Sequence, residues 1–339
     1  MQRTRWIYFV LFVALFTLIA VPIYLFNRSL GPSLQLDMPA QGGYSESQEN
    51  PPAALFAKLP QEDDSNRIDC GGSGRVNILY LGQNLPETPQ RGADAIRLMF
   101  INYEAPSIAS LSIPPDTLVE VADIEQADQT TLTKAFWLGQ QSLPTGQPAA
   151  LRSATEVVAQ ALYDNFGYTT EKYLIMNQPV FGRMIDTLGG IWVDVGSPVA
   201  SSGEMGPFEP GLQEMDSQRV LDYVRILASE PQVDAELSRF ERQNEVVRGI
   251  YEGLLDPGNI LKLPSLIGDF YHLLVTDLKP KELRSLHCML TEQEVHMRFE
   301  QVNGEMITGI IPERALEPDI AAVTALVAEL ESWDPVGSD

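Results

Sequence analysis

The chain has 339 residues, with 46 acidic side chains against 23 lysines and arginines, so its formal net charge at pH 7 is −23. A charge of this sign repels phosphate backbones, which excludes general nucleic-acid binding. Apolar residues make up 44% of the sequence and charged residues 20%, a balance typical of a folded core. We therefore expect most of the chain to fold, as one large domain or two ordinary ones.

Cysteine and histidine are scarce. Cys70 and Cys288 lack the paired spacing of a zinc or iron–sulfur site, and His272, His287 and His296 gather in one late segment that carries no catalytic-triad motif. A metal cluster of this kind and a histidine-based catalytic triad are therefore not expected. In an oxidising compartment the two cysteines either form one disulfide between the start and the end of the folded part or remain two thiols, and the sequence leaves both open.

The amino-terminal segment is apolar. Residues 6–26, WIYFVLFVALFTLIAVPIYLF, carry no charge and are long enough to cross a hydrocarbon layer of about 30 Å as a helix. Arg3 and Arg5 precede this segment, which predicts that residues 1–5 stay in the cytoplasm. A cleaved signal peptide is the alternative, but its apolar region is shorter and a small-residue cleavage site follows it. We expect one transmembrane helix at the cell membrane, with the main domain extracytoplasmic.

The remainder divides by composition. Residues 27–73 are rich in Ser, Gln, Pro, Gly and acids and have little periodicity, which is typical of a linker. In residues 74–333 strand and helix patterns interleave over short connections, and residues 334–339 form a tail. This organisation predicts a single α/β domain, a mixed central β-sheet with helices on both faces.

Apolar periodicity predicts the individual elements. Before residue 200 these are strands 76–82, 96–103 and 108–113, helices 131–138 and 152–165, strand 172–176, helix 179–188 and strand 191–195. After residue 200 they are helices 216–227 and 235–255, a Leu-rich stretch 260–274, helix 280–290, strands 295–302 and 305–311, and helix 319–333. Asn303-Gly304 separates the last two strands, which predicts a hairpin with a two-residue turn.

Arginines gather in the helix predicted at 235–255. Arg239 and Arg242 lie three residues apart on one helix face and Gln243 follows, while Arg225 ends the preceding helix and can join them across a helix hairpin. Guanidinium groups bind phosphate oxygens in pairs, so this cluster suits a phosphate ligand. The alternative is a solvated helix face on which nearby glutamates pair with the arginines.

Two carboxylates stand at strand ends. Asp94 lies at the entry to one strand, and Asp116 follows the end of another in SIPPDT. Ligands of α/β folds bind at strand ends, where carboxylates with arginines can hold a hydrated Mg²⁺ against a pyrophosphate. The alternative is that each aspartate caps a turn.

Eight segments in one order resemble the LytR-CpsA-Psr family, whose domain is also called the cell envelope-related transcriptional attenuator domain. They are NILYLG, RGADAIRLMFIN, LSIPPDTLVEV, LTKAF, KYLIMNQPVFGRMIDTLGGIWVDV, VLDYVRIL, LSRFERQNEVV and VTDLKPKEL. The resemblance extends over roughly residues 75–312. The resemblance implies an envelope enzyme that takes a glycopolymer from a polyprenyl-pyrophosphate carrier. It implies that the enzyme joins this polymer to peptidoglycan or another wall polymer through a phosphodiester.

The resemblance also implies roles for single residues. Asp94 matches the metal-binding carboxylate of the family's Arg-Ser-Asp motif, so the implied cofactor is Mg²⁺. Arg225 matches the Tyr-Val-Arg motif, and Arg239, Arg242 and Gln243 match the Arg-x-x-Arg-Gln helix, so the three arginines are implied as catalytic. The implied substrate-binding set is Arg225, Arg239, Arg242, Gln243 and Asp116. The lipid tail is expected in an apolar channel, which Leu254, Leu261, Leu266 and Phe270 either line or support as ordinary core.

The chain departs from the family pattern at several positions. Asn84 stands where the family has an aspartate after the first strand, Pro115 where it has the arginine of Pro-Arg-Asp, and Leu227 where it has the second arginine of Arg-x-Arg. Glu236 replaces an aspartate, and Arg91 lies one residue further from Asp94 than expected. Each charge-assisted hydrogen bond is worth roughly 1.5–3 kcal/mol, so losing two arginines predicts weaker transition-state binding.

These departures favour an alternative function. A catalytically silent module would hold a polyprenyl phosphate or a wall glycan without turning it over. A sensor tied to regulation is a third hypothesis, but a cytoplasmic part of about five residues is too short to pass a signal on readily.

Overall fold

The structure is a computed structural model that describes residues 69–83, 92–121, 129–141, 148–200, 206–226, 232–255, 259, 270–271, 273–310 and 315–335. Side chains are described for these residues except at 232–236 and 255. The expected membrane helix at 6–26 and most of the linker lie outside the described residues. Among the helices that are described, none combines the length and apolar character needed to cross a bilayer.

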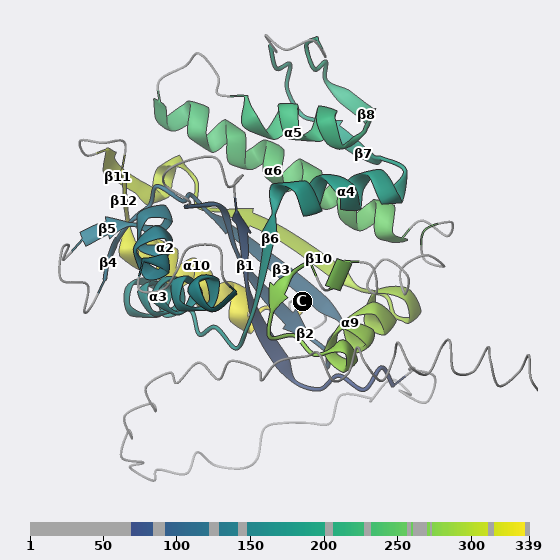
Figure 1. Ribbon diagram of the computed structural model, residues 1–339, viewed down its shortest axis with the longest axis horizontal. Coiled ribbons are helices and arrows are strands. Elements are labelled where there is room, and N and C mark those ends of the chain that lie inside the picture. The colour runs from purple at the N-terminus through teal and green to yellow at the C-terminus, as the bar shows by residue number, and fades with distance from the viewer. Residues whose placement is uncertain are drawn as a thin grey trace, which may run out of the picture. The chain divides into compact units, whose positions relative to one another are not determined.

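A central sheet of six strands organises the domain (Figure 1), in the order β10-β3-β2-β1-β6-β9. Its strands are β1 (Arg75–Gln83), β2 (Ala93–Asn102), β3 (Ser107–Ile113), β6 (Lys172–Asn177), β9 (Val275–Thr276) and β10 (His296–Gln301). β1 pairs antiparallel with β2, β2 with β3, and β6 with β9, whereas β1–β6 and β3–β10 are parallel. The prediction of a mixed α/β fold is confirmed.

The described helices correspond to the helical patterns of the sequence. They are α2 (Leu132–Gln140), α3 (Pro148–Phe166), α4 (Gln178–Leu188), α5 (Ser217–Arg225), α6 (Gln232–Leu255), α9 (Pro280–Glu292) and α10 (Ile320–Ser332). Capping side chains begin several of them: Asp216 accepts a hydrogen bond from the backbone N–H of Arg219 at the start of α5. α4 ends at Gly189, whose φ of 85° is a left-handed backbone conformation that glycine adopts without a steric clash, because it has no Cβ.

Helices cover both faces of the sheet. In β2, Phe100 packs edge-on against Tyr168, just after α3, with 5.3 Å between ring centroids. Its neighbour Met99 belongs to a cluster with Leu286 and Met289 of α9. Because successive residues of a strand point to opposite faces, α3 and α9 lie on opposite sides of β2.

Three two-stranded sheets surround the centre: β4 (Leu118–Glu120) with β5 (Gln129–Thr131), β7 (Ile191–Val195) with β8 (Gly211–Met215), and β11 (Ile307–Ile310) with β12 (Leu316–Pro318).

The hairpin predicted at Asn303-Gly304 is wrong. β10 pairs with β3 of the central sheet, and β11 pairs with β12 instead. The Asn303 side chain accepts a hydrogen bond from the N–H of Glu305 and starts a short 3-10 turn, Gly304–Met306, in place of a hairpin turn. β3 of the central sheet is a longer strand than β11 and therefore a longer pairing partner for β10.

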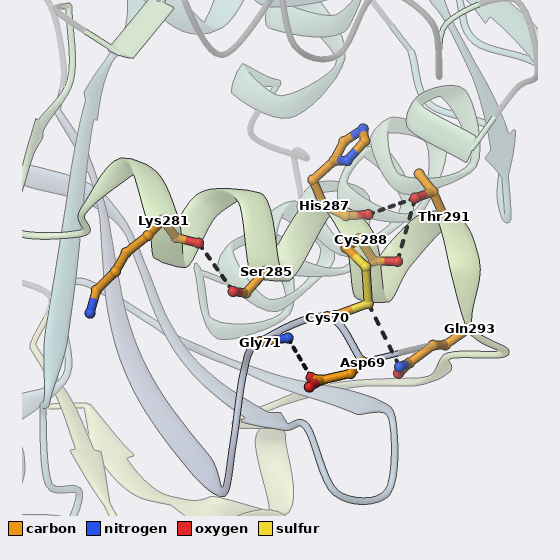
Figure 2. Close-up of a disulfide and its surroundings, with 9 residues drawn as sticks. All are labelled: Asp69, Cys70, Gly71, Lys281, Ser285, His287, Cys288, Thr291 and Gln293. Carbon is orange, nitrogen blue, oxygen red and sulfur yellow. Dashed lines mark hydrogen bonds between the residues drawn. A yellow bond between two sulfur atoms is a disulfide. The ribbon is translucent and has the colours of Figure 1, made fainter. Parts of the chain in front are cut away.

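The two cysteines are joined. Cys70 and Cys288 form a disulfide with their Cα atoms 5.4 Å apart, across a sequence separation of 218 residues (Figure 2). The side-chain amide of Gln293 donates to the Cys70 Sγ at 3.7 Å. Of the two arrangements that the sequence left open, the structure has the disulfide, which fixes the start of the described chain to α9.

Candidate active site

A cavity of about 390 Å³ opens where β1 and β3 end and β2 begins. Its polar wall is formed by Asp94, Asp116, Arg225, Arg239 and Gln243. Its apolar wall is formed by Met176, Phe181, Leu221, Val224, Val246 and Val247. Groups that suit a phosphate and groups that suit a hydrocarbon chain thus border one space.

Helix α6 presents one face to this cavity. Arg239, Gln243, Val246 and Val247 follow the i, i+4, i+7, i+8 spacing and all line the cavity. Phe240, on another face, is 1% exposed and anchors the helix in the core. The cavity-facing stripe is polar at its first two positions and apolar at the next two, so one helix serves both walls.

Helix α5 is held against α6 by its buried face. Val220 and Tyr223 are fully buried, and the Tyr223 hydroxyl donates to Glu245 Oε2 at 2.5 Å. Leu221 and Arg225, one turn apart, line the cavity from α5. The side chain of Arg225 therefore reaches the same space as Arg239.

The two aspartates and two arginines interact electrostatically. Burial raises the pKa of Asp94 above its ordinary value, and the negative charge of Asp116 adds to the rise. The charges of Arg239 and Arg225 oppose that rise in the pKa of Asp94. The residues predicted separately from strand ends and helices therefore form one charged group.

Arg242 has different surroundings from those expected of a phosphate-binding residue. Its side chain is 4% exposed, its Nε donates to the carbonyl oxygen of Tyr223 at 2.9 Å, and an Nη donates to the carbonyl oxygen of Ile226. These carbonyls lie at the end of α5, where the last carbonyl groups of a helix have no N–H partner within the helix. In this structure Arg242 holds the end of α5, one residue from Arg225, and its direct contact with phosphate stays a prediction.

A model of the LytR_cpsA_psr family matches residues 48–328 of the chain. The chain belongs to the LytR_cpsA_psr family.

Similar proteins are named as wall-polymer transferases. A polyisoprenyl-teichoic acid–peptidoglycan teichoic acid transferase TagU of Oceanobacillus iheyensis is 24% identical over 236 residues, which cover 68% of this chain and 69% of that protein. The protein of the same name from Bacillus subtilis is 21% identical over 295 residues, 85% of this chain and 90% of its own.

Solved structures share the LytR_cpsA_psr fold. The crystal structure of B. subtilis TagV superposes with a TM-score of 0.58 at 18% identity and covers 78% of this chain and all (100%) of its own. The structure of TagT bound to LIIa-WTA gives a TM-score of 0.56 at 18% identity, covering 78% and 92%.

Of the residues at which this chain departs from the family's sequence motifs, the structure describes only some. Pro115 lines the cavity, where its ring offers no hydrogen-bond donor. Asn84, Arg91, Leu227 and the side chain of Glu236 lie outside the described residues.

The four residues expected either to line an apolar channel or to support the core are placed only in part. Leu254 and Phe270 pack against a core cluster around β7, α5 and α6, and Leu261 and Leu266 lie outside the described residues. The apolar wall of the cavity comes from β6, α4, α5 and α6.

Sequence reasoning missed five polar lining residues: Tyr80, Gln83, Arg97, Thr133 and Gln178. A signal was present for one of them, because Arg97 interrupts the apolar run IRLMFIN in the middle of a core strand. The other four carry no comparable signal, because each suits an ordinary strand or the start of a helix.

The carboxylates fit the implied Mg²⁺. Asp94 and Asp116 border the same cavity, and the negative charge of Asp116 raises the pKa of Asp94, a repulsion that a divalent cation relieves. Mg²⁺ is commonly held by one or two carboxylates together with substrate phosphates. Within the described part of the chain no group of three or more His, Cys, Asp or Glu side chains is arranged for a metal. The fit is therefore to a site that substrate oxygens complete.

Proposed function

We propose that this chain is a membrane-anchored, extracytoplasmic phosphotransferase that attaches a polyprenyl-pyrophosphate-linked glycopolymer to peptidoglycan or another wall polymer. The observation that carries the proposal is the cavity in which Asp94, Asp116, Arg225 and Arg239 face an apolar wall. A pyrophosphate needs cationic donors and a polyprenyl chain needs apolar surface, and the substrate contains both. The names of the TagU relatives support the same class of reaction.

In the proposed reaction the acceptor hydroxyl of the wall polymer attacks the phosphorus next to the sugar. A new P–O bond forms, the bond to the bridging oxygen breaks, and polyprenyl phosphate leaves while the hydroxyl proton is released. Arg225 and Arg239 neutralise the charge that grows on the phosphoryl oxygens, and Gln243 donates to an oxygen. Arg242 acts as a positioning residue, because it holds the end of α5 that carries Arg225.

Asp94 is the proposed Mg²⁺ ligand, with Asp116 beside it in the same cavity. When bound, Mg²⁺ would supply positive charge against the pyrophosphate oxygens. Asp116 additionally orients the substrate through its position at the end of β3.

Membrane attachment is part of the proposal. Residues 6–26 would form a single-pass helix, with residues 1–5 in the cytoplasm and residues 27–73 as the tether to the catalytic domain. Full-length protein should remain in carbonate-washed membranes, and protease added outside spheroplasts should cleave it. Recovery in the soluble fraction would refute the anchor.

The decisive experiment is turnover by the full chain in detergent micelles. We expect release of polyprenyl phosphate from a polyprenyl-pyrophosphate sugar with Mg²⁺ and a wall-glycan acceptor. Arg239→Ala should abolish release, whereas Arg183→Ala, at an exposed position of α4, should leave it unchanged. Equal release by the Arg239→Ala variant would contradict the proposed site.

The position of Pro115 favours a second candidate function. It lines the cavity and contributes no donor, so fewer cations stabilise the transition state than the resemblance implies. A silent module would bind the polyprenyl-pyrophosphate sugar through Arg239 but release no polyprenyl phosphate. The same experiment separates the two functions.

A further inference from the structure

Arg97 is a charged residue in the middle of the central sheet. It lies on β2, is 4% exposed, and lines the cavity. Its cross-strand neighbours are Tyr80 on β1 and Ser112 on β3. Arginine is rarely this buried unless a partner group compensates its charge.

The hydrogen bonds of Arg97 are incomplete. Its Nη1 donates to the Ser110 Oγ at 3.4 Å, a long distance for a charged donor, and its buried Nη2 has no hydrogen-bond partner among the described residues. Burial lowers the pKa of Arg97 to about 10, and Tyr80 opposes that shift. Tyr80 itself is neutral at pH 7, because burial raises its pKa. Arg97 is therefore protonated at pH 7, with an unused donor and without a charged partner among the groups that shift its pKa.

The place of Arg97 in the cavity follows from strand register. Ala95 and Gly82 face each other nearer the strand ends, where their small size leaves room; a Cβ on Gly82 would lie 2.9 Å from the Ala95 Cβ. Arg97 and Tyr80 come two residues further into the sheet, about 7 Å deeper. Another two residues on, Met99 and Ile78 belong to the hydrophobic cluster beneath α9. Arg97 thus stands at the inner end of the cavity, beyond Asp94.

From this position we infer that Arg97 binds the phosphate that remains on the lipid carrier, an assignment that rests on the proposed function. A lipid pyrophosphate with its sugar directed outward presents its lipid-side phosphate deeper than its sugar-side phosphate. The unused Nη2 donor gains an oxygen partner, and the buried charge gains an opposite charge. Arg97 also supplies, from the floor of the cavity, a cation that Pro115 does not supply from its rim.

The competing role for Arg97 is purely structural. A structural arginine makes the unliganded protein less stable when it is replaced, whatever happens to ligand binding. A ligand-binding arginine with an unused donor has the opposite signature, because an apolar replacement removes an uncompensated charge. Affinity and unliganded stability together therefore discriminate between the two roles.

The test uses full-length protein in detergent micelles with Mg²⁺. Calorimetric titrations with farnesyl pyrophosphate, inorganic pyrophosphate and farnesol compare the natural protein with Arg97→Met, Arg97→Lys and the exposed-site control Arg183→Ala. We expect Arg97→Met to weaken farnesyl pyrophosphate binding roughly 10- to 100-fold, the loss of one or two charged hydrogen bonds. Farnesol binding should not weaken, and Arg97→Lys should lose less affinity than Arg97→Met.

Thermal unfolding provides the second measurement. Without ligand, Arg97→Met should melt at the same or a higher temperature than the natural protein, and farnesyl pyrophosphate should no longer raise its melting temperature. A lower melting temperature with unchanged affinity would assign Arg97 a structural role. If Arg97→Met does not fold, the decision falls to Arg97→Lys, and an affinity within threefold of the natural protein then overturns the inference.

The remaining outcomes separate the inference from the proposed function. If the natural protein binds no farnesyl pyrophosphate, both fall. If it binds farnesyl pyrophosphate and Arg97→Met binds equally well, only the inference falls. If Arg97→Met weakens inorganic pyrophosphate as much as farnesyl pyrophosphate, and the natural protein binds both equally, the site recognises free pyrophosphate and the lipid assignment is overturned.

Discussion

Arg239 and Arg242 lie three residues apart in α6, yet their guanidinium groups have different surroundings. Arg239 lines the cavity, and its positive charge opposes the rise in the pKa of Asp94. Arg242 donates to backbone carbonyls at the end of α5. The angular offset between the two positions on the helix is enough to direct one side chain to the cavity and the other to the backbone of α5. Residue type alone therefore does not assign a role in this cluster.

This difference predicts that two alanine substitutions affect different properties: Arg242→Ala affects stability, and Arg239→Ala affects phosphate binding. Arg242→Ala leaves the carbonyls of Tyr223 and Ile226 without their charged donor, so the free energy of unfolding should fall by about 2–4 kcal/mol. Arg239→Ala should change it by less than about 1 kcal/mol and should instead remove phosphate binding. Urea unfolding measured beside pyrophosphate binding checks both effects, and a large stability loss in Arg239→Ala would contradict the assignment.

The raised pKa of Asp94 predicts a stabilising substitution. A carboxyl group whose pKa is higher in the folded protein contributes most to stability when protonated, and this contribution is lost as pH rises through the folded pKa. At pH 7 Asp94→Asn should therefore raise the melting temperature of the unliganded protein, by roughly 2–4 °C if the gain is 1 kcal/mol. The difference from the natural protein should shrink as the pH is lowered.

Asp94→Asn should also abolish stabilisation by Mg²⁺. The matched control is Asp164→Asn on the exposed surface of α3, which removes one negative charge away from the cavity. Differential scanning fluorimetry with and without Mg²⁺, at several pH values, measures both effects. A lower melting temperature for Asp94→Asn at pH 7 would show that its ion pairs outweigh its burial.

At the scale of elements, α6 forms a wall of the cavity and packs on β7. A Cβ placed on Gly249 would lie 2.3 Å from the carbonyl oxygen of Trp192 in β7, a distance that no side chain tolerates. One turn later, a Cβ placed on Gly253 would lie 3.6 Å from Ile191 Cγ2, an ordinary van der Waals contact. The close approach of helix and strand at Gly249 therefore sets the position of the cavity-facing stripe of α6.

Two glycine-to-alanine substitutions test this packing. Gly249→Ala should lower the free energy of unfolding by about 1–3 kcal/mol, because the backbone of β7 must move away. Gly253→Ala should be neutral or stabilise by up to about 1 kcal/mol, because alanine favours the helix and has room. Chemical denaturation of both variants gives the comparison, and equal effects would show that α6 and β7 are not in close contact.

At the scale of the whole molecule, one covalent bond joins distant parts of the chain. Cys70 precedes β1, and Cys288 lies in α9 on one face of the central sheet. The hydrophobic cluster around Ile78, Ile101 and Met289 lies in the region that the bond closes. The disulfide thus reinforces the end of the domain opposite the cavity mouth.

Reduction should therefore destabilise the protein, by about 2–5 kcal/mol for a native disulfide that closes a long loop. We expect a reductant to lower the melting temperature of the natural protein and to leave that of a Cys70→Ser, Cys288→Ser variant unchanged. Alkylation of Cys70 and Cys288 should require prior reduction. An identical melting temperature with and without reductant would contradict the stabilising role.

The sequence by itself determined the fold class, the family and most element positions. Apolar periodicity placed β1, β2, β3 and the described helices within a few residues, because burial of alternating or helical stripes is a local property of the chain. The ordered motifs singled out Asp94, Asp116, Arg225, Arg239 and Gln243, which the cavity brings together.

Only the tertiary structure decided pairings and directions. In the structure β10 pairs with β3 and not in a hairpin, and Cys70 is bonded to Cys288. Arg242 donates to the end of α5, and Arg97 lies at the inner end of the cavity. Each of these depends on which distant segment lies opposite a residue. Periodicity reports which face of an element is buried and carries no information about the partner that buries it.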